Sequence, residues 1–184
     1  MAETQAPVLL VGLGNELRGD DGVGIAVIRS LREDCPVGVE PRAEGGDPLA
    51  LVEAWRGRAA TVVVDAVRAA APAGTILHLD AGAGPLPASL AAAASTHATS
   101  LAAAVELARE LGTLPGRALV LGVVGRRFRQ GEGLSAAVAA ALPTVAEEAR
   151  QLAAREATRE TLARETAGTV RGCAARPGTC TPAS

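Results

Sequence analysis

The 184-residue chain contains no lysine or tyrosine, one tryptophan, one phenylalanine and three cysteines. With so few aromatic rings, it lacks the stacking surfaces on which single-strand nucleic-acid binders depend. All 18 basic residues are arginines, and the chain also has 20 acidic residues, so its formal net charge is −2. This balance argues against a nucleic-acid binder, which normally has a basic surface. Cys35, Cys173 and Cys180 are too few and too scattered for a disulfide scaffold or a zinc ribbon, and we assign no role to them.

Long hydrophobic runs are also missing. No stretch approaches the ~20 uninterrupted apolar residues of a membrane-spanning helix, and residues 1–7 lack the basic and apolar pattern of a signal peptide. We therefore expect a cytoplasmic protein without membrane insertion. The length suits a domain of about 150 residues with a short excess. We predict an α/β domain over residues 1–150, a helical extension over 151–166 and a disordered tail over 167–184.

Short apolar runs alternate with helical patterns along most of the chain. Strands are predicted at residues 7–12, 37–43, 60–64, 74–80 and 118–124. Helices are predicted at residues 22–33, 47–55, 98–112 and from 134 to about 165, the last with a Ser135 cap and an interruption at Pro143. This alternation indicates an α/β fold. We expect a three-layer sandwich with about five strands in a mostly parallel, twisted sheet and helices on both faces.

A glycine-rich segment, residues 12–24, joins the first predicted strand to the first helix. It suggests a phosphate cradle but fails both usual tests. Leu17 stands where the dinucleotide fingerprint has its third glycine, and the chain has no lysine for a phosphate-binding loop. Asp20 and Asp21 would also place negative charge where a phosphate should bind. A nucleotide-binding domain is therefore disfavoured. As a simpler alternative, the two aspartates only begin a helix, an interpretation that weighs more for Asp20.

Acidic residues follow three of the predicted strands. Asp20 and Asp21 come after the first strand, Glu44 after the second, and Asp65 closes the third. Since ligands of parallel α/β sheets bind beyond the carboxyl ends of the strands, we expect these side chains at one edge. Unpaired acids that converge there repel each other unless a cation or a shared proton relieves the repulsion. The pattern therefore favours a metal site over coincidence.

Histidine is rare, and one of the two present is placed to join such a site. His78 lies on the alternating strand 74–80, where a half-exposed side chain is the expected interpretation. His97 lies just before a predicted helix, at the end of an element rather than on an apolar face. Together with two carboxylates, His97 would complete a mixed nitrogen and oxygen set suited to nickel, zinc, iron or manganese, with open positions.

Five short motifs follow one another along the chain: Gly12-x-Gly14-Asn15-x-Leu17-x-x-Asp20-Asp21-Gly22-x-Gly24, Glu44-Gly45-Gly46, Val64-Asp65-Ala66, Ser95-x-His97 and Gly122-Val123-Val124. In order and spacing they resemble the nickel-iron hydrogenase maturation endopeptidases, over about residues 8–150. Each motif alone is weak, but the opening motif combined with the later aspartate and histidine is specific.

The resemblance implies an activity and a set of site residues. Members of this family remove a short C-terminal peptide from the hydrogenase large-subunit precursor once nickel has been inserted, and the bound nickel is the recognition signal. The family's metal-contacting, catalytic positions fall on Asp21, Asp65 and His97, with nickel supplied by the substrate rather than permanently bound. Asn15, Asp20 and Glu44 are weaker candidates that would contact substrate or support the ligands. The resemblance implies a peptidase, of aspartic or metal-assisted mechanism.

Two points stay open. The same residues would serve a non-catalytic nickel-binding or docking protein on this scaffold, and only a processing assay separates the two. The chain also departs from the family pattern: Glu44 stands where an aspartate often precedes the paired glycines, and residues 125–129 replace an expected proline-containing turn. The three arginines of that segment, Arg126, Arg127 and Arg129, could contact the substrate's tail, but a solvated loop is the favoured interpretation.

Overall fold

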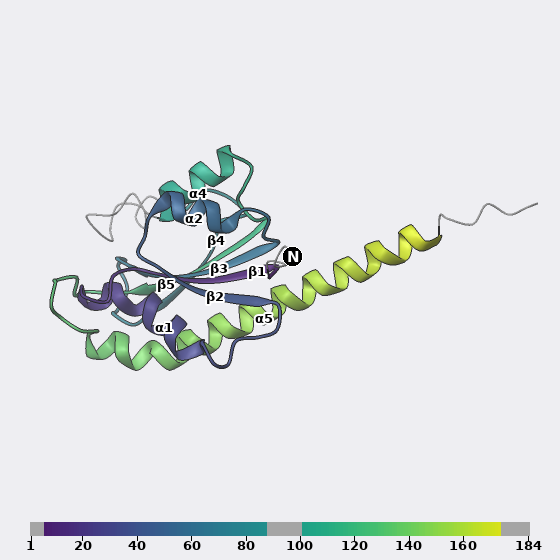
Figure 1. Ribbon diagram of the computed structural model, residues 1–184. Coiled ribbons are helices and arrows are strands. Elements are labelled where there is room, and N and C mark those ends of the chain that lie inside the picture. The colour runs from purple at the N-terminus through teal and green to yellow at the C-terminus, as the bar shows by residue number, and fades with distance from the viewer. Residues whose placement is uncertain (1–5, 88–100, 174–184) are drawn as a thin grey trace, which may run out of the picture.

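The computed structural model describes residues 6–87 and 101–173, and in them strands and helices alternate as predicted (Figure 1). The elements are, in chain order, β1 (Val8–Leu13), η1 (Gly19–Gly22), α1 (Val23–Leu31), β2 (Val39–Glu44), α2 (Pro48–Trp55), β3 (Ala60–Val67), β4 (Ile76–Asp80), α4 (Leu101–Glu110), β5 (Arg117–Val124) and α5 (Ala136–Cys173). No helix among the described residues is long and apolar enough to cross a membrane.

The five strands form one sheet in the order β2-β1-β3-β5-β4. The first four are parallel, and β4 pairs antiparallel with β5 at one edge. Every residue of the neighbouring strands β1 and β3 is buried, because helices cover both faces of the sheet. Pro41 lies on the opposite edge strand, β2, where its missing N–H breaks no central ladder. The predicted α/β sandwich with a mostly parallel sheet is confirmed.

The helices divide between the two faces of the sheet. Figure 1 shows α1 and α5 on one side and α2 and α4 on the other. On β3, Val62 and Val64 belong to the cluster packed by α1 and α5, whereas Val63 belongs to the cluster packed by α2 and α4. Since strand side chains alternate with period two, Asp65 lies on the same face as Val63. The face covered by α2 and α4 therefore carries Asp65.

A close contact between two glycines fixes α1 against β1. A Cβ atom on Gly12 would lie 2.0 Å from the carbonyl oxygen of Gly24, and one on Gly24 would lie 2.4 Å from those of Leu13 and Val64. Only glycine permits this approach of helix to strand. The contact holds α1, and with it the preceding η1 turn, next to the carboxyl ends of β1 and β3.

Strand β3 is longer than predicted, which corrects the position of Asp65. We expected Asp65 to close the strand, but β3 continues to Val67. The pairing of β1 with β3 ends at Val64, whereas β5 continues to pair, with Asp65 opposite Gly122 and Val67 opposite Val124. Asp65 is thus held in a strand on its β5 side, just beyond the last pair with β1.

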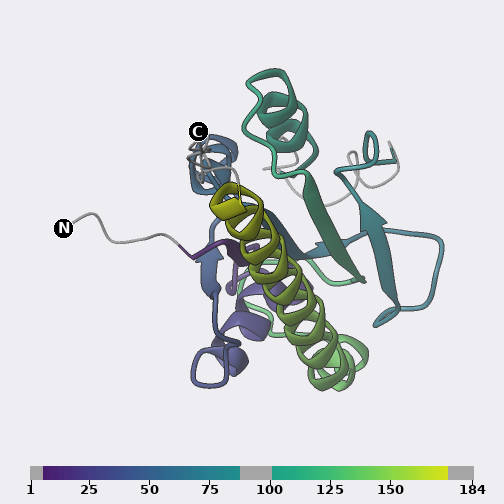
Figure 2. The same ribbon diagram turned by 90° about the vertical axis from the view of Figure 1, so that its right-hand side faces the viewer.

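The last helix also differs from the prediction. Pro143 lies inside α5 and does not interrupt it. Because proline has no N–H, the carbonyl of Ala139 lacks its intrahelical donor. Both residues are exposed, so water can donate to that carbonyl instead. The helix continues to Cys173 rather than ending near residue 165, so it includes part of the predicted tail. Figure 2 shows it lying across the molecule, and in Figure 1 its C-terminal part projects beyond the sheet. Residues 174–184 lie outside the described part of the chain.

Candidate functional site

Two predicted site residues, Asp21 of η1 and Asp65 of β3, lie together at the carboxyl edge of the sheet. Gly14 makes this possible, because its φ of 127° belongs to the region that favours glycine and turns the chain sharply after β1. A Cβ atom on Gly14 would lie 1.8 Å from the carbonyl oxygen of Asp21. The η1 turn therefore folds directly onto the end of β1 and carries Asp21 towards β3.

Burial and charge set the protonation of this pair. Asp65 is 8% exposed and Asp21 is 6% exposed. Burial and the negative charge of Asp21 raise the pKa of Asp65 to about 7, although a hydrogen bond from the Ala66 N–H partly opposes the rise. Near neutral pH, Asp65 is therefore poised between its protonated and ionised forms. The repulsion expected from converging acids is thus present at one pair, Asp21 with Asp65.

Asp20 has a different role from its neighbour Asp21. It is fully buried, and its carboxylate accepts hydrogen bonds from the backbone N–H groups of Arg126 (2.8 Å), Arg127 (2.9 Å) and Ser135 (2.6 Å). Burial alone would raise the pKa of Asp20, but these three hydrogen bonds lower it below its usual value. Asp20 therefore joins η1 to the segment between β5 and α5. It supports the position of Asp21 instead of acting as an unpaired acid.

The weaker candidates Asn15 and Glu44 lie beside the η1 loop. The Asn15 side chain accepts a hydrogen bond from the Leu17 N–H (2.9 Å), and it lines a pocket of about 450 Å³ together with Gly14 and Gly45. Glu44 ends β2 opposite Leu13, and its carboxylate forms an ion pair with Arg42 (2.7 Å). Both residues lie at the predicted edge of the sheet, but Glu44 is already partnered.

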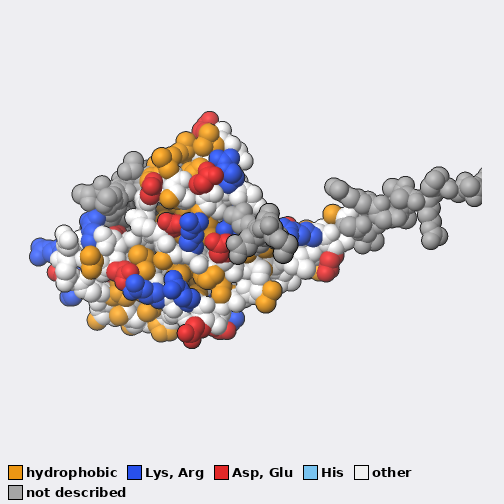
Figure 3. All heavy atoms as spheres, viewed as in Figure 1, with side chains coloured by type: hydrophobic (Ala, Val, Ile, Leu, Met, Phe, Trp, Pro, Cys, Tyr) orange, Lys and Arg blue, Asp and Glu red, His pale blue; other side chains and the backbone are white. Residues whose placement is uncertain are grey.

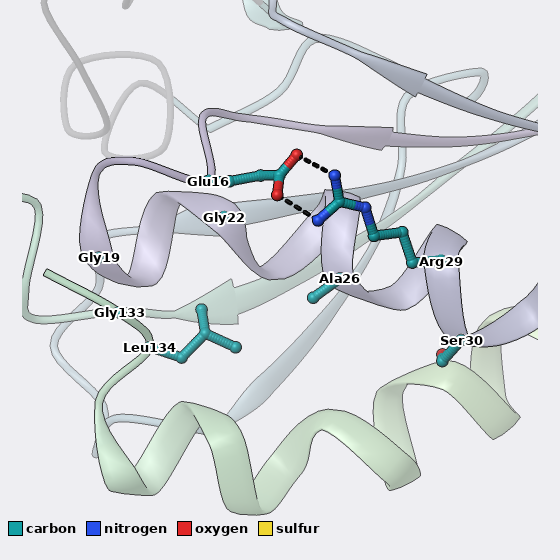
Figure 4. Close-up of a pocket in the computed structure, with 8 residues that line it drawn as sticks. All are labelled: Glu16, Gly19, Gly22, Ala26, Arg29, Ser30, Gly133 and Leu134. Atoms are coloured by element: carbon teal, nitrogen blue, oxygen red, sulfur yellow. Dashed lines mark hydrogen bonds and ion pairs between the residues drawn. The ribbon is translucent and has the colours of Figure 1, made fainter. Parts of the chain in front are cut away.

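Glu16 lies near the same loop, yet its carboxylate points to α1. It forms a two-pronged ion pair with Arg29, one contact of which measures 2.6 Å (Figure 4). The two residues line a pocket of about 520 Å³ between α1 and the segment before α5. Neither Asp21 nor Asp65 lines that pocket. Proximity in sequence therefore does not make Glu16 part of the carboxylate pair.

The predicted histidine, His97, lies outside the described residues. Within residues 6–87 and 101–173, no three His, Cys, Asp or Glu side chains are placed to hold a metal ion together. The other histidine, His78, lies on β4 with its Nε2 atom 3.0 Å from the carboxylate of Glu148 on α5. A three-ligand site built on Asp21 and Asp65 therefore needs a donor from outside the described part, and His97 stays the predicted one.

The sequence predicted that Asp20, Asp21 and Asp65 lie at this edge of the sheet and named Asp20 as a candidate to support the ligands, but it did not show what holds Asp20. The three N–H groups that donate hydrogen bonds to Asp20 belong to residues more than 100 positions away in the sequence. No local pattern reports such a contact. The available signal was indirect: two adjacent aspartates on a glycine-rich turn cannot both remain buried and unpaired without a cost.

Comparisons with known proteins give the family. The family model described as hydrogenase maturation protease matches residues 43–152, which is 110 of the 184 residues. The matched stretch contains Asp65 and His97, while Asp21 lies before it. No match was found among curated proteins.

Solved structures share the fold. The [NiFe] hydrogenase maturation protease HybD from Thermococcus kodakarensis is 26% identical, with a TM-score of 0.61, over 79% of this chain and 98% of that one. The hydrogenase 2 maturation peptidase from Thaumarchaeota archaeon SCGC_AB-539-E09 is 27% identical, with a TM-score of 0.54, over 76% and 93%. The hydrogenase maturating endopeptidase HybD from Escherichia coli is 23% identical, with a TM-score of 0.63, over 77% and 88%. The parallel sheet, the sequence motifs and the family model agree, and the chain belongs to the hydrogenase maturation protease family.

Proposed function

We propose that this peptidase removes the C-terminal peptide from the nickel-loaded precursor of a nickel-iron hydrogenase large subunit, in the cytoplasm. Membership of the maturation protease family supports the reaction class. The observation that carries the site is the buried Asp21–Asp65 pair, in which the two carboxylates are close enough to shift the pKa of Asp65. Such a pair, at the carboxyl edge of a parallel sheet, is placed where α/β proteins bind ligands.

The residues fit a divalent metal ion that arrives with the substrate. The charges of these two buried carboxylates repel each other, and a cation bound by both would remove that repulsion, which adds to the effect of burial in raising the pKa of Asp65. Carboxylate oxygens together with an imidazole suit nickel and similar ions. Asp21, Asp65 and His97 would hold the metal, while the precursor would provide its remaining ligands. A site with few protein ligands would bind free metal weakly.

Because the protein and the precursor would each provide part of the metal's ligands, only a precursor that contains nickel would be recognised. A precursor that contains nickel would complete the coordination of Asp21 and Asp65, and its peptide would thereby be positioned at the sheet edge. A precursor without nickel would leave the charge repulsion between the two carboxylates in place. Selectivity would thus rest on a contact that the wrong substrate cannot make.

The carboxylate pair also suits proton transfer during hydrolysis. A group with a pKa near the working pH exchanges protons most effectively, and the pKa of Asp65 lies at about 7. As the alternative to holding the metal, Asp65 would accept the proton of the attacking water, and Asp21 would hold the pair's remaining negative charge. A metal bound at the site would supply Lewis-acid polarisation of a carbonyl or a water.

The test is processing of a nickel-loaded precursor by site variants. We expect Asp21→Asn, Asp65→Asn and His97→Ala to fold and to lose processing. Glu16→Gln is the matched control, because Glu16 is an acid of the same loop whose carboxylate pairs with Arg29 instead. Processing at the normal rate by all three variants would refute the site. Metal binding without cleavage by the normal protein would instead show a docking protein.

A further inference from the structure

Four arginines surround one pocket at the edge of the sheet where Asp65 lies. The pocket measures about 370 Å³ and is lined by Arg68, Arg126, Arg127, Phe128, Arg129 and Glu132. Arg68 directly follows β3, and the other three belong to the segment after β5. Figure 3 shows basic side chains at the left-hand end of the molecule, where this segment lies in Figure 1. One acid among four bases leaves the pocket strongly positive.

The loop that carries these arginines is held in place by its backbone. The Asp20 carboxylate accepts hydrogen bonds from the backbone N–H groups of Arg126 and Arg127, and the Asp20 backbone N–H donates to the carbonyl of Arg127 (2.7 Å). Further along, the Gly131 N–H donates to the carbonyl of Leu17 (2.7 Å). Phe128 is 9% exposed and anchors the loop in the core. The pocket is therefore a built feature rather than a freely moving loop.

Side-chain contacts orient two of the guanidinium groups. The guanidinium carbon of Arg68 lies 4.1 Å from the centre of the Phe128 ring, a cation–π contact between the two halves of the pocket. Arg126 donates to the carbonyl of Ala71 (2.7 Å). Neither contact neutralises a positive charge. Both keep a positive group at the pocket wall.

The pocket's arginines differ from most other arginines in the described part of the chain, because they have no acidic partner there. Among the described residues, none of Arg68, Arg126, Arg127 and Arg129 forms an ion pair, although all four are exposed. By contrast, ion pairs engage the arginines at positions 29, 42, 56, 58, 109, 117, 150, 159 and 164. Like charges gathered on a fixed loop repel one another, and an anion would relieve that repulsion.

We infer that this pocket binds a carboxylate of the precursor's C-terminal peptide and so helps to position the bond to be cut. The inference rests on the proposed function. Asp20 is the neighbour of Asp21 and accepts hydrogen bonds from the backbone N–H groups of Arg126 and Arg127, so the loop that carries the arginines lies beside the η1 turn that carries one member of the aspartate pair. A substrate carboxylate a few residues from the scissile bond would therefore reach the guanidinium groups while that bond lies at the aspartate pair. Arginine suits such a ligand because its planar donors match a carboxylate.

The first experiment measures binding of synthetic peptides by nuclear magnetic resonance titration. The probe is an acetylated glycine–glutamate–glutamate–glycine peptide with a free carboxyl end, at low ionic strength. Arg127→Gln/Arg129→Gln should weaken its binding about tenfold, the size expected for losing charged hydrogen bonds. Arg32→Gln/Arg155→Gln is the control, because it removes the same charge from exposed arginines that do not line the pocket. Equal weakening in both variants would overturn the inference.

Two further arms identify the ligand. Amidation of the peptide's carboxyl end tests the terminal carboxylate, and replacement of glutamate by glutamine tests the side chains. At least one change should abolish the dependence on the pocket arginines. Arginine-dependent binding of inorganic phosphate, without binding of the acidic peptide, would overturn the inference.

The last arm links the pocket to processing. With a nickel-loaded precursor, Arg127→Gln/Arg129→Gln should raise KM about tenfold, and the control variant should not. Asp21→Asn should retain binding of the acidic peptide while losing processing. If the pocket variant cleaved the precursor with an unchanged KM, the pocket's role would be refuted and the proposed function would stand. Arginine-dependent peptide binding without any cleavage would refute the proposed function and leave the anion site.

Discussion

Asp20 and Asp65 are both buried carboxylates at one edge of the sheet, yet their pKa values are shifted in opposite directions. For Asp20, three backbone N–H groups outweigh the effect of burial and lower the pKa. For Asp65, burial and the charge of Asp21 raise the pKa to about 7. Environment thus separates an ionised structural acid from one that can exchange a proton near neutrality. The contrast places Asp20 in the scaffold and agrees with the role that we propose for Asp65.

Replacement of Asp20 should destabilise the protein at neutral pH. In Asp20→Asn, the amide nitrogen faces backbone donors, so we expect the free energy of unfolding to fall by about 2–3 kcal/mol. Because the folded pKa of Asp20 is below its unfolded value, the stabilisation is present above about pH 4 and is lost as the pH falls through the folded pKa. Urea unfolding at pH 7 and pH 3 measures the difference. Asp34→Asn, at an exposed site, should change little, and equal losses in both would contradict this account.

Replacement of Asp65 should have the opposite effect. The folded pKa of Asp65 lies above its unfolded value, so its contribution to stability is full below about pH 4 and is lost as the pH rises towards 7. In the presence of a chelator, Asp65→Asn should therefore be more stable than the normal protein at pH 8, on the order of 2–4 kcal/mol. The two should converge near pH 4. Urea unfolding at a series of pH values measures this, and equal stability at pH 8 would be evidence against a strained carboxylate pair.

Gly14 should be required for both folding and the site. In Gly14→Ala, the new Cβ atom would meet the carbonyl oxygen of Asp21 at 1.8 Å, and alanine disfavours the φ of 127°. We expect a loss of about 2–4 kcal/mol in unfolding free energy, and reduced processing in whatever protein folds. Gly116→Ala is the control, because no atom lies within 4 Å of its added Cβ. Normal stability of Gly14→Ala would show that η1 does not rest on the end of β1.

The length of α5 that the domain needs can be tested by truncation. We predicted a domain over residues 1–150, but Ala153 and Ala157 are buried, and Glu156 pairs with Arg117 at the start of β5 (3.1 Å). A chain that ends at Arg150 should therefore lose at least about 2 kcal/mol of stability. A chain that ends at Leu162 should unfold as the full-length protein does, because residues 161–167 are exposed. Equal stability of both truncations would support the boundary at residue 150.

Local sequence patterns predicted the elements well where their cause is local. Asp47 caps α2 by accepting the Leu49 N–H, with Pro48 at the first helical position, as its sequence indicated. Contacts between distant segments were beyond such patterns. The pairing with β5 extends β3 past Asp65. The backbone N–H groups of residues 126, 127 and 135 donate hydrogen bonds to the Asp20 carboxylate.

The same distinction between local patterns and contacts of distant segments applies to the candidate site. The acids at the strand ends could be placed at one sheet edge because parallel strands share their direction. Which of them would interact with each other could not be predicted, because contacts such as the ion pair between Glu44 and Arg42 depend on side-chain geometry. The sequence pointed to Arg126, Arg127 and Arg129 but favoured a solvated loop. It could not show that Arg68, 61 residues before Arg129, joins them through the pairing of β3 with β5.

The most direct test of the central claim is the intact mass of a large-subunit precursor before and after incubation with this protein, with and without nickel. We predict that the nickel-loaded precursor loses a short C-terminal peptide and that the nickel-free precursor keeps its mass. Asp65→Asn should leave both masses unchanged. Cleavage of both forms would contradict nickel as the recognition signal. If no large subunit from the same cell changed mass in its nickel-loaded form, the proposed peptidase activity would be contradicted.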